Sequence, residues 1–198
     1  MEILQVDYKL KWSDLRMGPF TWDKSSTGLV LSSFFWGYML TQIPGGYISR
    51  AVGGTRVFGY AMLMCTILTA LTPVLAHAHY GLLVLARILE GACQGVVFPA
   101  QHHIWSEWAP PLERSMLVAY SYAGNQAGNI LALPMSGLLC DWLGWESIFF
   151  FFGIIGLIWF IFWIIFAYDT PACHPRISER EKNYIERSHC GQLEQSGV

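Results

Sequence analysis

The segment from Ser147 to Tyr168, SIFFFFGIIGLIWFIFWIIFAY, contains no charged side chain. A helix needs about 20 apolar residues to cross a bilayer's hydrocarbon core, which is about 30 Å thick. Only 13% of the 198 residues are charged, whereas an average globular chain has roughly 25%. Four further windows are long and apolar enough: 27–49, 57–76, 81–105 and 116–140. We therefore predict an all-α membrane protein with five spans, the last at 147–168.

The rest of the composition excludes several other classes of protein. A net charge of −2 gives no basic surface for a nucleic acid, and the apolar content excludes a disordered chain. The five cysteines have no paired spacing, so they indicate neither a disulfide framework nor a zinc site. We divide the chain into a segment over 1–26, a transmembrane bundle over 27–168 and a tail over 169–198.

The distribution of Lys and Arg predicts the orientation, because these residues gather on the cytoplasmic side of a membrane. Seven of them lie on the side of the tail: Arg50, Arg56, Arg114, Arg176, Arg180, Lys182 and Arg187. Four lie in the N-terminal segment: Lys9, Lys11, Arg16 and Lys24. We predict a cytoplasmic tail and a lumenal or extracellular segment 1–26.

The tail carries the pattern of a helix start. Ser178 is a candidate N-cap, and Glu181 follows three residues later, as in a capping box. The pattern predicts a short surface helix after Ser178. The alternative is a frayed tail.

Two charged residues lie deep in the third span, where a charge is costly and demands a partner or a function. Arg87 and Glu90 have i, i+3 spacing and can pair on one face of a helix. Gln94 and Gln101 lie within about 60° of the same face, at about 100° per residue. This stripe predicts the lining of a solvated cavity, in which the Arg87 guanidinium binds an anion such as a carboxylate or phosphate. The alternatives are an outward-reaching Arg87 or a purely structural ion pair.

Polar residues in two other spans are candidates for the walls of that cavity. In the fourth span, one face carries Tyr122, Asn125, Gln126 and Asn129, and in the first span Tyr38 and Gln42 are one turn apart. Helix packing is the alternative for each of them. Small residues at i, i+4 spacing, as at Gly91 and Gly95, are typical of close helix packing.

The histidines favour no metal site. His77 and His79 lie near one membrane face and His102 and His103 near the other, and the spacings do not match the clusters of membrane di-iron oxygenases. The sequence also lacks a Ser-His-Asp arrangement in helix register, a phosphate-binding loop and a CxxC pair. We therefore expect no enzyme activity, no metal and no cofactor beyond a coupling ion.

Four segments carry a resemblance to a known family: SSFFWGYMLTQIPGGYISRAVGG, ARILEGACQGVVFPAQHHIW, SEWAPPLERS and DTPACHPRISEREKNYI. Together they resemble the anion:cation symporters that include sialin, the vesicular glutamate transporters and the type I sodium-phosphate cotransporters, within the major facilitator superfamily. The resemblance implies a twelve-helix fold of two six-helix halves with the substrate between them. The five spans would match helices two to six of the N-terminal half. Helix one and the C-terminal half would then be absent, which suggests a fragment.

The resemblance also implies residue roles. Arg87 matches the family's helix-four arginine, which is implicated in anion recognition. Glu90 stands where sialin has a glutamate and the vesicular glutamate transporters have glutamine. Gln94 replaces a glutamate tied to proton coupling, and Leu31 replaces a histidine of the vesicular glutamate transporters. His102 matches a family histidine, so ion coupling is assigned to Glu90, Gln94 and His102.

The loop between the first two spans corresponds to the superfamily's cytoplasmic gate. Arg50 and Arg56 flank Gly53-Gly54, and Arg50 replaces the usual acid of the gate signature. We assign Arg50, Gly53 and Arg56, together with Gly91 and Gly95, gate or structural roles.

The expected function is transport of a small anion by alternating access, coupled to H⁺ or Na⁺. Sialic acid, glutamate, urate and phosphate remain open as substrates. Arg87 would hold the anion, with Tyr38, Gln42, Tyr122, Asn125 and Gln126 along the path. The expected location is a lysosomal, vesicular or plasma membrane. The alternative is a truncated, non-transporting protein that assembles or interferes with full-length transporters.

Overall fold

The computed structural model describes residues 23–195. Residues 1–22 of the predicted lumenal or extracellular segment, with Lys9, Lys11 and Arg16, lie outside the described residues, as do residues 196–198 of the tail. The described elements are α1 (Lys24–Val52), α2 (Gly54–Ala78), α3 (Tyr80–Trp108), α4 (Arg114–Leu143), α5 (Glu146–Phe166), the 3-10 turn η1 (Pro171–Cys173) and α6 (Glu179–Gln195). The prediction of an all-α fold is confirmed for this part of the chain.

The long helices extend beyond most of the predicted windows, and α1 and α3 begin at side-chain caps. Asp23 Oδ1 accepts a hydrogen bond from the Ser26 amide at 2.9 Å and so starts α1. Hydrogen bonds from Ser26 also lower the pKa of Asp23. His79 Nδ1 accepts from the Gly81 amide at 3.0 Å and starts α3. Only α5 ends earlier than expected, at Phe166, because the chain becomes extended at Ala167.

Among the described helices, α2, α3 and α5 are long and apolar enough to cross a membrane. The apolar side chains of α5 are mostly exposed, as expected for a helix that faces lipid. The predicted spans in α1 and α4 fall outside this group, because Ser, Gly, Gln and Asn dilute their apolar residues.

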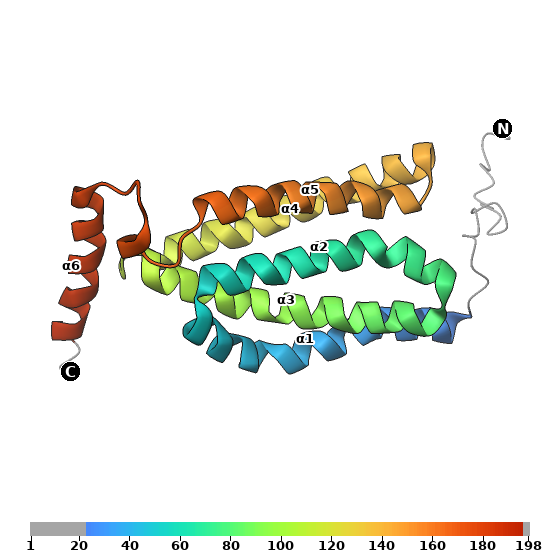
Figure 1. Ribbon diagram of the computed structural model, residues 1–198, viewed down its shortest axis with the longest axis horizontal. Coiled ribbons are helices and arrows are strands. Elements are labelled where there is room, and N and C mark those ends of the chain that lie inside the picture. Colours follow the sequence, from blue (N-terminus) through green and yellow to red (C-terminus); the bar gives the residue numbers. More distant parts are fainter. Residues whose placement is uncertain (1–22, 196–198) are drawn as a thin grey trace, which may run out of the picture.

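The five long helices of the described chain run side by side (Figure 1). From the bottom of that view upward the order is α1, α3, α2 and α5, and α4 lies behind α5. We call the end that carries the α1–α2 connection, the α3–α4 connection and α6 the tail end, and the other the far end. At the far end, the Tyr80 hydroxyl of α3 donates to the Ser26 carbonyl of α1 at 2.9 Å.

Helices α1 and α3 pack with their backbones in contact. A Cβ on Gly91 would overlap the carbonyl oxygen of Phe34, and one on Gly37 would overlap that of Ile88. The Thr41 hydroxyl donates across the same contact to the Ala92 carbonyl at 2.8 Å. Gly95 faces α1 one turn further along. Hence the small residues of α3 serve a close helix–helix contact.

Helix α4 is packed much less closely than α1. None of its residues is buried in the described structure. A Cβ added at Gly124 or Gly128 would meet nothing within 4 Å. Helix α4 therefore leaves a broad face uncovered.

The tail forms the predicted surface helix, and the alternative of a frayed tail is wrong. The Ser178 hydroxyl accepts from the Glu181 amide at 3.2 Å, which confirms the predicted N-cap. Helix α6 lies across the tail end instead of continuing the direction of the bundle (Figure 1). The Tyr184 hydroxyl donates to Glu113 Oε1 at 3.1 Å, and this carboxylate raises the pKa of Tyr184. The hydrogen bond joins α6 to the α3–α4 connection.

The contrast between α1 and α4 predicts how glycine replacements act. Gly91→Val should lower the free energy of unfolding by about 3 kcal/mol or more, because the new side chain meets the α1 backbone. Gly128→Val is the matched control, since it makes the same change in an open position. Reversible unfolding of both variants in detergent micelles measures the difference. Equal losses in the two variants would contradict the α1–α3 contact.

Candidate functional site

The centre of the bundle holds an ion pair on α3. Arg87 Nη1 donates to Glu90 Oε2 at 2.8 Å, so the pairing predicted from the i, i+3 spacing is present. The Glu90 residue is 3% exposed, whereas the Arg87 side chain is 30% exposed. The acid is thus enclosed, and the guanidinium remains partly accessible.

Helix α2 supplies further donors to the buried carboxylate. The hydroxyls of Thr69 and Thr72 lie 3.4 Å and 3.5 Å from Glu90 Oε1. One oxygen of Glu90 therefore faces the guanidinium and the other faces α2. A buried charge requires such partners, because desolvation without them costs several kcal/mol. The sequence analysis missed both threonines, although their i, i+3 spacing places them on one face of α2.

A cavity of about 400 Å³ lies between α2, α3 and α4. Of the predicted residues, Gln94, Gln101, Tyr122 and Asn125 line it. Five lining residues were not predicted: Phe58, Met62, Val97, Phe98 and Ser121. Only the tertiary structure places these residues beside the amides. The cavity combines aromatic walls with amide and hydroxyl groups, which suits a small polar solute.

Several predicted site residues lie elsewhere. Neither Arg87 nor Glu90 is among the residues that line this cavity, so the stripe on α3 is divided between an ion pair and a cavity wall. Tyr38 stacks on Phe34 of its own helix, with ring centroids 6.0 Å apart. Gln42 and Gln126 are exposed on α1 and α4. Of the residues predicted to line the solute path, the structure therefore places Tyr122 and Asn125 in one cavity and leaves the others outside it.

The histidines lie at the two ends of the bundle. His102 Nε2 is 3.4 Å from the Tyr122 hydroxyl, which connects it to a residue of the cavity wall. His77 Nε2 is 2.9 Å from Glu146 Oε1 at the far end. Among the side chains that the structure describes, no three from His, Cys, Asp or Glu form a group that could hold a metal ion.

The tail end contains a second polar cluster, built around the start of α2. Gly53 has φ of 108°, a conformation that favours glycine, and a Cβ there would lie 2.6 Å from Asp169 Oδ1. Asp169 Oδ1 accepts from the Thr55 amide at 3.0 Å, and Asp169 Oδ2 lies 3.2 Å from Arg56 Nε. Asp169 therefore acts as a cap for α2 although it follows α5 in the sequence.

Two tryptophan side chains donate hydrogen bonds to backbone carbonyls at the junction of α2 with the start of the tail. Trp108 Nε1 donates to the Tyr168 carbonyl at 3.0 Å, and Trp163 Nε1 donates to the Thr55 carbonyl at 3.0 Å. The sequence analysis identified Arg56 and Gly53 but missed Asp169, although it is the first acid after the last span. Arg50 is exposed and forms no ion pair with another described residue.

The fold and the site define a multi-pass helical membrane protein with a partly buried ion pair and a cavity between helices. Comparison with known families finds a match to the Major Facilitator Superfamily over residues 9–194. This chain belongs to that superfamily.

Its curated relatives include vesicular glutamate transporters. Vesicular glutamate transporter 3 of Danio rerio is 50% identical over 174 residues, which are 88% of this chain and 30% of the relative. Vesicular glutamate transporter 2 of Homo sapiens is 47% identical over 169 residues, 85% of this chain and 29% of the relative. The chain thus spans less than a third of the length of these relatives. The resemblance inferred from the sequence motifs is confirmed at the level of the family.

The cap on α2 predicts two separable effects of replacing Asp169. Asp169→Ala should speed exchange of the Thr55 amide hydrogen about 5- to 30-fold, since a helix cap contributes about 1–2 kcal/mol. Asp169→Asn should preserve most of the protection, because it keeps an acceptor and loses only the exposed ion pair with Arg56. Hydrogen exchange followed by mass spectrometry measures both. Asp141→Ala, at an exposed acid of α4, is the control, and unchanged exchange in Asp169→Ala would refute the cap.

Proposed function

We propose that this chain supplies the anion-binding part of a membrane transporter that works by alternating access. The observation that carries the proposal is the ion pair of Arg87 and Glu90, whose carboxylate is buried at the α2–α3 contact while the guanidinium stays partly exposed. A cation within an apolar bundle attracts an anion more strongly than it would in bulk water, because the low-dielectric surroundings screen it little.

The geometry of the pair supports a coupling mechanism. Glu90 and an anionic solute compete for the same guanidinium, whose planar fork suits a carboxylate or a phosphate. A proton on Glu90 weakens its hold on Arg87 and frees donors for the solute. Anion and proton would then be bound together. Na⁺ is the other coupling ion that the family resemblance leaves open.

The remaining predicted residues take supporting roles in this proposal. Tyr122 and Asn125 line the solute path, with Gln126, Tyr38 and Gln42 reaching it in the complete transporter. Gln94 and His102 assist coupling from the cavity wall and its rim. Arg56 and Gly53 close the tail end through Asp169, with Arg50 beside them. The tail faces the cytoplasm, and the substrate class comprises sialic acid, glutamate, urate and phosphate.

A second candidate function rests on the open face of α4. Its exposed Asn125, Gln126 and Asn129 and its open glycines suit contact with another polypeptide. In this alternative the chain transports nothing alone and assembles or interferes with full-length transporters. Saturable anion uptake by the 198-residue chain alone in vesicles would exclude it.

The first prediction about transport concerns the replacement of Arg87. In a complete transporter that contains this segment, Arg87→Ala should lower anion uptake at least about 100-fold, because losing a buried charged partner costs about 3 kcal/mol. Arg87→Lys should recover only part of the uptake, since an ammonium group cannot reproduce the planar fork. Uptake of labelled anion is compared with surface expression, and Arg176→Ala in the tail is the control. Normal uptake by Arg87→Ala would remove Arg87 from the site.

The second prediction concerns the role of Glu90 in coupling transport to a proton gradient. Glu90→Gln keeps the shape of the side chain but cannot exchange a proton. Net uptake driven by a pH gradient should therefore fall, while exchange of internal for external anion persists. The two assays are run on the same vesicles. If uptake of the variant still follows the pH gradient, Glu90 does not couple the proton, and dependence on external Na⁺ then identifies the other ion.

A further inference from the structure

A second cavity, of about 250 Å³, lies between α2 and α5 at the tail end of the bundle. Arg56 and Asp169, the ion pair at the start of α2, are among the residues that line it. Four aromatic side chains also line it: Tyr60, Phe160, Trp163 and Tyr168. It shares no lining residue with the cavity between α2, α3 and α4, so it is a separate site.

The cavity extends from the end of the membrane spans into the apolar part of the bundle. Helices α2 and α5 are both long and apolar enough to cross a membrane. Arg56 lies in the first turn of α2, and Asp169 follows the last residue of α5, Phe166, by three positions. Tyr60 lies one turn further along α2, and Phe160 lies within α5. The charged groups are therefore at the level of lipid headgroups, where tyrosine and tryptophan are also enriched.

The ion pair leaves part of the guanidinium available to a ligand. Arg56 Nε lies 3.2 Å from Asp169 Oδ2, and the Arg56 side chain is 69% exposed. Among the described side chains, neither terminal nitrogen of Arg56 has a hydrogen-bond partner. A guanidinium carries five N–H donors, and its planar fork suits a phosphate. Asp169 thus orients Arg56 through one edge, and the other edge remains free for an anion.

The other side of the cavity suits a cation. The rings of Tyr60 and Phe160 lie with centroids 6.0 Å apart at an angle of 50°, and Asp169 adds a negative charge. Aromatic faces attract cations, and quaternary ammonium groups above all. Both oxygens of Asp169 already face donors, the Thr55 amide and Arg56 Nε. A trimethylammonium group needs no further acceptors, whereas a primary ammonium needs partners for three N–H groups.

We propose that this cavity binds the phosphocholine headgroup of a membrane lipid. Arg56 binds the phosphate, and the aromatic rings with Asp169 hold the trimethylammonium group. The volume of about 250 Å³ is below the roughly 300–1,000 Å³ of pockets that enclose whole small molecules. A headgroup fits such a volume, because its acyl chains stay outside in the membrane. This site does not depend on the proposed transport function.

The experiment measures which lipid stays bound to the protein. The full 198-residue chain is extracted by detergent from vesicles that contain equal amounts of phosphatidylcholine, phosphatidylethanolamine and phosphatidylglycerol. Native mass spectrometry then identifies the lipids that remain on the chain. We expect one retained lipid per chain, with phosphatidylcholine favoured over phosphatidylethanolamine at least about 5-fold, because only its ammonium is methylated. Preferential retention of either other lipid, or equal retention of all three, would overturn the proposal.

Two variants separate the parts of the headgroup. Tyr60→Leu should remove the preference for phosphatidylcholine over phosphatidylethanolamine, because it removes an aromatic face. Arg56→Gln should lower retention of all three lipids about 10-fold, because each of them contains a phosphate. A preference that persists in Tyr60→Leu, or retention that is unchanged in Arg56→Gln, would exclude this binding mode.

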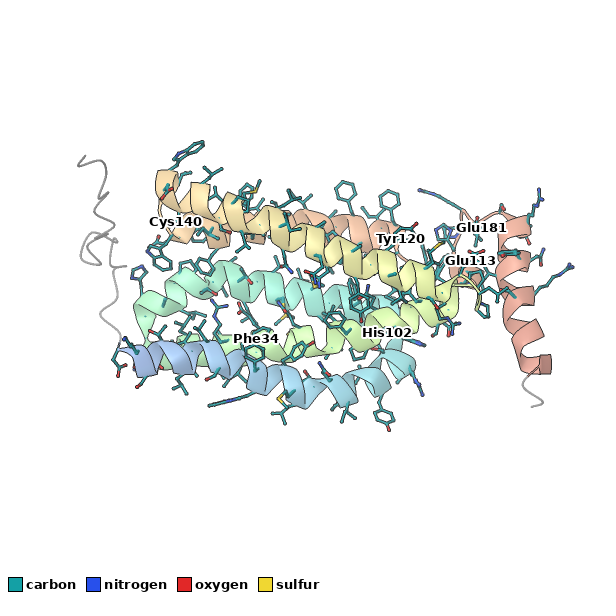
Figure 2. All side chains as sticks on the ribbon, turned by 180° about the vertical axis from the view of Figure 1, so that it is seen from behind. Phe34, His102, Glu113, Tyr120, Cys140 and Glu181 are labelled. Carbon is teal, nitrogen blue, oxygen red and sulfur yellow. The ribbon has the colours of Figure 1, made fainter. Side chains whose placement is uncertain are left out.

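Tyr120 and Arg176 provide matched controls, because both are exposed and neither lines the cavity. Figure 2 shows Tyr120 on α4, towards the tail end of the bundle. Tyr120→Leu and Arg176→Gln should retain phosphatidylcholine like the wild type.

Cross-linking of the wild type tests the site even if a variant fails to fold. A phosphatidylcholine with a photoreactive group on the acyl chain near the glycerol should label peptides that contain residues 56–60 of α2 or 160–164 of α5. An excess of unlabelled phosphatidylcholine should suppress this labelling, and an equal excess of phosphatidylglycerol should not. Labelling that is confined to other helices would overturn the proposal.

Discussion

The arrangement of the bundle depends on one enclosed carboxylate. Glu90 cannot lose its water inside an apolar helix contact unless donors replace that water. Arg87 provides one donor from the same helix, and Thr69 and Thr72 provide two from α2. Because these hydroxyls must lie opposite Glu90, the carboxylate fixes how α2 is aligned along α3. That alignment also brings Cys65 against the Glu90 carbonyl.

Helix α3 presents different chemistry to each neighbour. Its glycines face α1, where the absence of side chains lets two backbones touch. Its acid faces α2, where hydroxyls satisfy it. Its amides at Gln94 and Gln101 face the cavity shared with α4. One helix thus combines tight packing, a charged side chain and access to a cavity. Successive residues of an α-helix are rotated by about 100°, so side chains at different positions face different neighbouring helices.

Helix α4 and the tail end differ in whether their polar groups have partners within the described chain. Helix α4 leaves amides exposed, and such groups need water or another protein inside a bilayer. At the tail end, in contrast, Asp169, Thr55 and Arg56 satisfy one another, and Trp108 and Trp163 cover the junction. The first region suits contact with a solute or partner, and the second holds α2 and the start of the tail together.

Sequence alone determined the all-α fold, the five long helices, the helix cap at Ser178 and the pairing of Arg87 with Glu90. These features depend on hydropathy and on spacing within one helix, both of which are local. It could not show that Gln94 faces a cavity while Glu90 faces threonines, that Asp169 caps α2, or that Cys65 lies against the Glu90 carbonyl. Each of these contacts joins residues of different helices, and their meeting depends on the rotation and alignment of whole helices against one another. Only the tertiary structure decides that alignment, because the glycine packing of α1 on α3 and the burial of the Glu90 carboxylate against α2 must be satisfied together.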